Sequence, residues 1–188
     1  MPVPSFSVTR WAIRNHRSTK AVFRRWSAVA SAALLSTLSP APADADSWTN
    51  HWIRCRGEDP IRQIRACSAL IGSRRETQAN LARAHFNRGH AFTENGEFDR
   101  AIQDFGRALM LDPDYPDAFN SRGLAYVARG EAEKAIQDFD RAIALDPNYA
   151  IAIYNRALAV QSLGRAAEAA QGFENAKQAG PRLKEPKE

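Results

Sequence analysis

Two aspartates, Asp104 and Asp138, stand beside a phenylalanine in nearly identical segments, AIQDFGRALMLDP and AIQDFDRAIALDP. Arginines recur with the same period at Arg88, Arg122 and Arg156. A carboxylate beside a guanidinium can belong to an acid–base site or to an ion pair that fixes packing. Catalysis needs one asymmetric set of groups, and this pattern repeats. We therefore predict structural ion pairs that join neighbouring repeats, namely Asp104–Arg122 and Asp138–Arg156. The alternative is that the pairs form within one repeat, as Arg88–Asp104 and Arg122–Asp138.

The chain has two cysteines, Cys55 and Cys67. In an oxidising compartment such a pair forms a disulfide, and closing so short a loop stabilises by about 3 kcal/mol. The competing interpretations are two free thiols, with Cys67 on the apolar face of a helix after Pro60, and a zinc site. Zinc takes about four ligands, and beyond the first 43 residues the chain adds only three histidines without CxxC or HxxxH spacing: His51, His85 and His90. We predict the disulfide, no metal and no cofactor.

Other catalytic signals do not appear in the sequence. It contains no Ser/His/Asp set, no glycine-rich phosphate loop and no metal-ligand spacing that would indicate an enzyme. We therefore expect a protein without catalytic activity.

The basic charge is concentrated at the N-terminus. The chain has a net charge of +5, which alone would suggest a nucleic-acid partner. The first 43 residues contain no acid and six basic residues, so 20 basic residues face 21 acidic ones in the rest of the chain. We therefore expect no nucleic-acid partner. The six are Arg10, Arg14, Arg17, Lys20, Arg24 and Arg25.

This basic stretch begins a typical leader. The apolar run WSAVASAALLSTLS follows it, and small residues then offer A-x-A cleavage signals. The run is shorter than the ~20 residues that span a bilayer. We predict a signal peptide over residues 1–45, cleaved near Ala43 or Ala45, a periplasmic or secreted location, and no membrane span in the mature chain. The competing interpretation is a mitochondrial transit peptide, because the same stretch is arginine-rich and free of acids.

From residue 82 onward the chain repeats every 34 residues. Leu-Asp-Pro ends at Pro113 and again at Pro147, and residues 82–115 and 116–149 are identical at 17 of 34 positions. Each period contains an apolar helical face, a glycine that ends the helix, a second helical face and a proline stop. Helix, turn and helix in tandem predict an all-α fold, an α-solenoid.

This pattern resembles the tetratricopeptide repeat (TPR) family, whose 34-residue units carry small and aromatic residues in this order. The resemblance covers three units, 82–115, 116–149 and 150–183. Residues 46–81 are expected to form a degenerate N-terminal half unit, a helix over 60–73 after a partial helix around 48–54, and 182–188 a polar tail. The chain departs from the family in having no tryptophan near each unit's start, where it carries His85, Phe119 and Ile153.

The resemblance implies a function in protein–protein interaction, because first helices in this family line a concave groove that holds a peptide or partner protein. The family's clamp for a chaperone's terminal carboxylate uses lysines and an arginine, where this chain has Phe86, His90, Ser121, Ile151 and Asn155. We therefore expect an apolar or amide-bonded peptide. The predicted groove residues are Phe86, Asn87, His90, Asn120, Leu124, Val127, Tyr154, Asn155 and Leu158, with Phe86, Tyr154 and Leu158 as anchors.

Two further expectations follow from the resemblance. No capping helix follows the third unit, so its end could meet a partner or a second copy of the chain. If the leader is a transit peptide, the same array would serve as a mitochondrial assembly or import factor.

Overall fold

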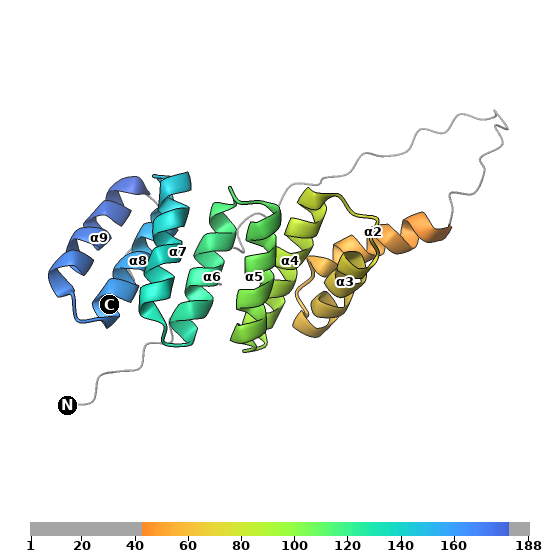
Figure 1. The fold of residues 1–188 in the computed structure, drawn as a ribbon, viewed down its shortest axis with the longest axis horizontal. Helices are drawn as coiled ribbons and strands as arrows, with labels where there is room; N and C mark the ends of the chain where they lie inside the picture. Colours follow the sequence, from red (N-terminus) through yellow and green to blue (C-terminus); the bar gives the residue numbers. More distant parts are fainter. Residues whose placement is uncertain (1–42, 181–188) are drawn as a thin grey trace, which may run out of the picture. The chain divides into compact units, whose positions relative to one another are not determined.

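The computed structural model describes residues 43–180, with side chains from residue 48 onward, so most of the predicted signal peptide and the tail lie outside the described residues. The described part contains eight α-helices and no strand (Figure 1). The helices are α2 (Ala43–Cys55), α3 (Pro60–Gly72), α4 (Gln78–Glu94), α5 (Phe98–Leu111), α6 (Pro116–Ala128), α7 (Ala132–Leu145), α8 (Ala150–Ser162) and α9 (Ala166–Ala179).

The helices pair into hairpins that follow one another along the array in Figure 1. α4 packs on α5, α6 on α7 and α8 on α9, while α3 contacts α4, α5 contacts α6 and α7 contacts α8. The predicted α-solenoid is confirmed. α2 and α3 also pack together, so the N-terminal segment is a complete hairpin where the sequence predicted a half unit.

The helices keep the 34-residue period that the sequence predicted. α5, α7 and α9 begin at Phe98, Ala132 and Ala166. α4 is the exception, because it begins at Gln78, ahead of the predicted boundary at residue 82. The side chain of Thr77 accepts a hydrogen bond from the N–H of Asn80, and such an N-cap stabilises an earlier start.

Each hairpin of the three repeats turns at a glycine. Gly96, Gly130 and Gly164 have φ angles of +79°, +76° and +77°. This left-handed conformation is accessible to glycine at little cost, which is why it ends helices. The turns lie where the sequence predicted them.

A phenylalanine packed on a glycine sets the spacing of the helices in the first two repeats. Phe105 and Phe139 are buried, with 1% and 0% of their surface exposed. A Cβ atom on Gly89 would lie 2.7 Å from Cε1 of Phe105, and one on Gly123 would lie 2.7 Å from Cε1 of Phe139. A larger residue than glycine would therefore force the two helices apart.

Candidate functional site

The repeated arginines and aspartates form ion pairs within each of the first two repeats. Arg88 donates from Nε and Nη2 to the two carboxylate oxygens of Asp104, at 2.6 and 2.8 Å. Arg122 does the same to Asp138, at 2.8 and 2.7 Å. The predicted pairing between neighbours is wrong, because the antiparallel helices of one hairpin bring these positions face to face.

The third repeat replaces the aspartate with Gly172, and its arginine turns elsewhere. Nε of Arg156 donates to Asp140 of α7 at 2.5 Å, and Nη1 donates to Glu168 of α9 at 3.2 Å. An ion pair between neighbouring repeats therefore exists here, but its acid is Asp140 and the predicted partner Asp138 is bound to Arg122.

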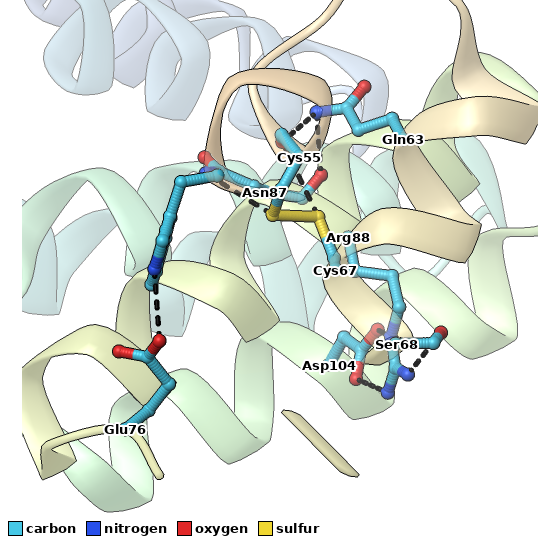
Figure 2. The surroundings of a disulfide bond; sticks show 9 residues. Cys55, Gln63, Cys67, Ser68, Glu76, Asn87, Arg88 and Asp104 are labelled. Carbon is cyan, nitrogen blue, oxygen red and sulfur yellow. Dashed lines mark hydrogen bonds and ion pairs between the residues drawn. A yellow bond between two sulfur atoms is a disulfide. The ribbon is translucent and has the colours of Figure 1, made fainter. Parts of the chain in front are cut away.

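The surroundings of Asp104 favour a permanent charge. Nδ1 of His85 lies 2.8 Å from Oδ1 of Asp104. Arg88 also donates to Ser68 at 2.8 Å (Figure 2). Burial by itself would raise the pKa of Asp104, but the hydrogen bonds from Arg88 and His85 outweigh it, so the pKa lies below the ordinary value. A carboxylate held charged in this way is suited to an ion pair and is a poor proton acceptor at neutral pH.

Cys55 at the end of α2 and Cys67 in α3 form the disulfide that the sequence predicted (Figure 2). Both cysteines are fully buried. Beside them, Nε2 of Gln63 donates to the carbonyl oxygens of Cys55 and Asn87, each at 3.1 Å. The covalent bond thus joins α2 to α3, and Gln63 joins this hairpin to α4.

Glu76 also holds α2 in place through hydrogen bonds, and the sequence analysis did not predict this. The indole nitrogens of Trp48 and Trp52 donate to its Oε1 at 2.7 and 3.0 Å, and Asn80 donates to its Oε2 at 2.6 Å. The two tryptophans are four residues apart, so they share one helix face. That spacing was the available signal, but the sequence does not show which acceptor they reach.

The predicted groove residues divide into two groups. The first group is partly exposed and lies on the first helices of the three repeats, and we call it the first-helix face: Phe86, His90, Leu124, Val127, Tyr154 and Leu158. Phe86 packs edge-on against His90 with ring centroids 4.6 Å apart and against Tyr115 at 4.8 Å. Phe86, Leu124 and Val127 also pack against the core.

The second group is the amides, and two of them correct the prediction. Asn120 and Asn155 are buried, with 6% and 4% of their surface exposed, and Nδ2 of Asn155 donates to Oδ1 of Asn120 at 2.9 Å. They join α6 to α8 and do not belong to the exposed surface. Short polar side chains need a bonding partner when buried, and these two provide it for each other.

Similar polar links join the other first helices. Oγ of Ser121 in α6 lies 3.2 Å from Nε2 of His90 in α4. Nδ2 of Asn87 in α4 lies 3.9 Å from Sγ of Cys55 in α2, and Figure 2 shows Asn87 directed toward the disulfide. The column of positions that contains Asn87, Ser121 and Asn155 therefore holds successive first helices together.

Two tyrosines outside the prediction stay protonated. The hydroxyl of Tyr149 donates to Asp117 at 2.5 Å, and burial together with that carboxylate raises the pKa of Tyr149. Burial and the charge of Asp117 also raise the pKa of Tyr115 to about 12. At neutral pH both hydroxyls are therefore hydrogen-bond donors.

The described residues hold no group of three or more His, Cys, Asp or Glu side chains that could bind a metal ion. Within the same part of the chain, no helix is long and apolar enough to cross a membrane.

Comparison with known proteins identifies the repeat. A family model described as TPR repeat matches residues 89–130 and 123–164. No curated protein sequence matches the chain.

Three solved structures illustrate the similarity. The crystal structure of MamA is 28% identical with a TM-score of 0.59, over 64% of this chain and 68% of MamA. The first TPR of Spaghetti (RPAP3), bound to the HSP90 peptide SRMEEVD, is 25% identical with a TM-score of 0.54, over 55% of this chain and 82% of that one. The second TPR domain of human RPAP3, in complex with the HSP70 peptide SGPTIEEVD, is 32% identical with a TM-score of 0.52, over 57% and 87%.

Proposed function

Because the chain belongs to the tetratricopeptide repeat family, we propose that it is a non-enzymatic interaction module that holds a peptide segment of a partner protein on its first-helix face after export. Proteins of this family generally serve as protein-binding scaffolds. Two of the similar structures are bound to peptides of HSP90 and HSP70. Both facts support a peptide or protein as the partner.

The observation that carries the proposal is the contrast between repeated and unrepeated side chains. The repeated arginines and aspartates are bonded to each other inside the hairpins. The first-helix face does not repeat, since one set of equivalent positions holds His90, Leu124 and Leu158. The position equivalent to Phe86 and Tyr154 is the buried Asn120 in the second repeat. Side chains that are partly exposed and have no common structural task are free to differ according to the partner they contact.

The composition of this face indicates the class of peptide. His90, Leu124 and Leu158 occupy equivalent positions, and none is a permanent cation. The face therefore suits apolar side chains, with Tyr154 and Leu158 as anchors in the sense of binding hot spots. Phe86 has a double task because it also packs against the core.

The disulfide supports export, because disulfides persist in oxidising compartments and are rare in the cytosol. Cleavage after Ala43 or Ala45 would place the new N-terminus in the first turn of α2. N-terminal sequencing of the mature protein separates the two destinations: a start at Asp44 or Asp46 supports export, and cleavage within the arginine-rich stretch supports mitochondrial import.

The interaction is tested by isolating the partner complex from the native compartment with the wild type and with Tyr154→Ala/Leu158→Ala. We expect the double variant to weaken binding of the same partner about tenfold or more. The matched control is Ile61→Ala/Met110→Ala, which truncates two apolar side chains that are 57% and 72% exposed outside the face. Equal losses in both variants, or a loss in the control alone, would contradict the proposed function.

A further inference from the structure

The N-terminal hairpin contains a basic hollow that belongs to neither the ion pairs nor the first-helix face. It has a volume of about 410 Å³. α2 contributes His51 and Arg54, and α3 contributes Arg62, Arg65 and Ala66. A hollow of this size is in the range that accommodates a small organic ligand or a few side chains of a peptide.

The arginines of the hollow are not neutralised as those of the repeats are. Arg54 and Arg65 make no ion pair among the described residues, and Arg62 makes one at 3.3 Å with Asp59. Both partners of that pair are solvent-exposed, with 80% and 51% of their side chains accessible, so its attraction is weak. By contrast, Arg88 and Arg122 are each held by two hydrogen bonds to a buried carboxylate.

The walls of the hollow are held in place before any ligand arrives. The disulfide joins α2 to α3, and Gln63 joins both to the backbone of α4. The buried residues of α3 are Gln63, Ala66, Cys67 and Leu70, and of these only Ala66 also lines the hollow. Arg62 and Arg65 are exposed. Helices that are already joined lose less entropy when a ligand binds between them.

The hydrogen bonds of α3 favour carboxylates over a phosphate group. Phosphates bind at helix N-termini because free backbone N–H groups point at them. At the start of α3, Oδ1 of Asp59 already accepts from the N–H groups of Ile61 and Arg62, at 3.0 and 3.1 Å. Asp59 therefore already occupies these donors. The guanidinium groups, which come from two helices, remain for several separate carboxylates.

We propose that this hollow binds an acidic segment of a partner protein, with Arg54 and Arg65 contacting its carboxylates. The site contains no residue of α4, α6 or α8, so it does not depend on the peptide bound at the first-helix face.

The test measures fluorescence anisotropy of a labelled peptide of alternating glutamate and glycine, with the full chain at low salt. The matched peptide has glutamine for glutamate. We expect the acidic peptide to bind at least about tenfold more tightly than its glutamine counterpart. Arg54→Gln/Arg65→Gln should remove most of this preference. Arg107→Gln/Arg141→Gln takes the same charge from exposed positions on α5 and α7 and should change binding less than about twofold.

Three results would overturn the proposal. Equal losses in the two double variants would mean that net charge alone attracts the peptide. No preference of the wild type for the acidic peptide would mean that the hollow does not bind carboxylates. Displacement of the peptide by pyrophosphate at concentrations where citrate has no effect would assign the hollow to phosphate. Thermal unfolding at the wild-type temperature verifies that each variant is folded.

Discussion

The first two repeats and the third have the same backbone period but different interiors. In the first two, a buried phenylalanine packs on glycine and an aspartate binds the arginine of the first helix. In the third, Ala157 replaces the glycine and Gly172 replaces the aspartate, and a Cβ atom on Gly172 would lie only 2.9 Å from that of Ala157. The two changes are therefore coupled, because the methyl group of Ala157 occupies room that a larger residue at 172 would need.

The exchange also alters what the third repeat buries. Phe173 is only partly buried and packs on Tyr154, with ring centroids 5.3 Å apart. α9 buries two residues, Ala169 and Ala176, whereas α7 buries six. The repeats therefore share a backbone period but bury different numbers of side chains, and we expect the third repeat to be held less firmly.

The largest expected effect comes from removing one partner of a buried pair. Asp138→Ala leaves Arg122, whose side chain is 24% exposed, without its carboxylate. We expect the free energy of unfolding to fall by about 3 kcal/mol, because an uncompensated charge remains inside the hairpin. Urea denaturation followed by circular dichroism measures the change.

The control for that variant is the ion pair of the third repeat. Asp140 is 52% exposed, so Asp140→Ala should cost about 1 kcal/mol or less. A loss at Asp140 as large as that at Asp138 would show that the two kinds of pair do not differ.

A smaller effect is expected where helix spacing depends on glycine. Gly123→Ala introduces a methyl group 2.7 Å from the ring of Phe139, and we expect overpacking to destabilise the protein by about 1–3 kcal/mol. Gly106 is the matched control, because a Cβ atom there lies 3.7 Å from Nη1 of Arg122. Gly106→Ala should raise the midpoint of thermal unfolding through helix propensity, and a rise for Gly123→Ala as well would refute the packing account.

The weaker interior of the third repeat should appear in amide hydrogen exchange. We expect α9 to exchange faster than α5 and α7, because few buried contacts oppose its local opening. Mass spectrometry of peptides from each helix measures the protection. Equal protection of α7 and α9 from exchange would contradict this expectation. It would mean that the two buried alanines stabilise α9 as well as the six buried residues stabilise α7.

The smallest effect is the pH dependence that Asp104 contributes to stability. The pKa of Asp104 is lowered in the folded protein, and an aspartate in the unfolded chain titrates near about 3.9. Between these values the unfolded state binds more protons, so stability rises with pH. The contribution of Asp104 is complete above about pH 4 and is lost as the pH falls through its folded pKa.

Replacing the carboxylate of Asp104 tests whether it makes stability rise with pH. Asp104→Asn should lower stability at neutral pH and flatten the loss of stability on acidification, both measured by urea denaturation at several pH values. An unchanged acid dependence would indicate that other carboxylates account for it.

The sequence predicted the elements well and their contacts only in part. Helices, glycine turns and the α-solenoid follow from a period that is visible without a structure. The partner of Asp104 does not, because Arg88 and Arg122 lie 16 and 18 residues away and both choices keep the period. Only the antiparallel packing of one hairpin decides between them.

The residues of the candidate site could also be predicted only in part. Position on a first helix predicted which residues belong near the face, and Tyr154 and Leu158 are partly exposed there. Asn120 and Asn155 were also predicted, but they are buried against each other. Consecutive residues of a helix point in different directions. Whether a given side chain is exposed therefore depends on where the neighbouring helix packs, and the local sequence pattern does not show this.

We propose that the unrepeated first-helix face, and not the second helices, binds the partner. Site-specific photo-crosslinking in the native compartment tests it, with a benzoylphenylalanine in place of Leu158 or, as the control, of Met110, which is 72% exposed on α5. We predict a crosslink from position 158 to one defined peptide segment of a partner and none from position 110. A crosslink to that partner from position 110 and none from position 158 would show instead that the second helices bind it.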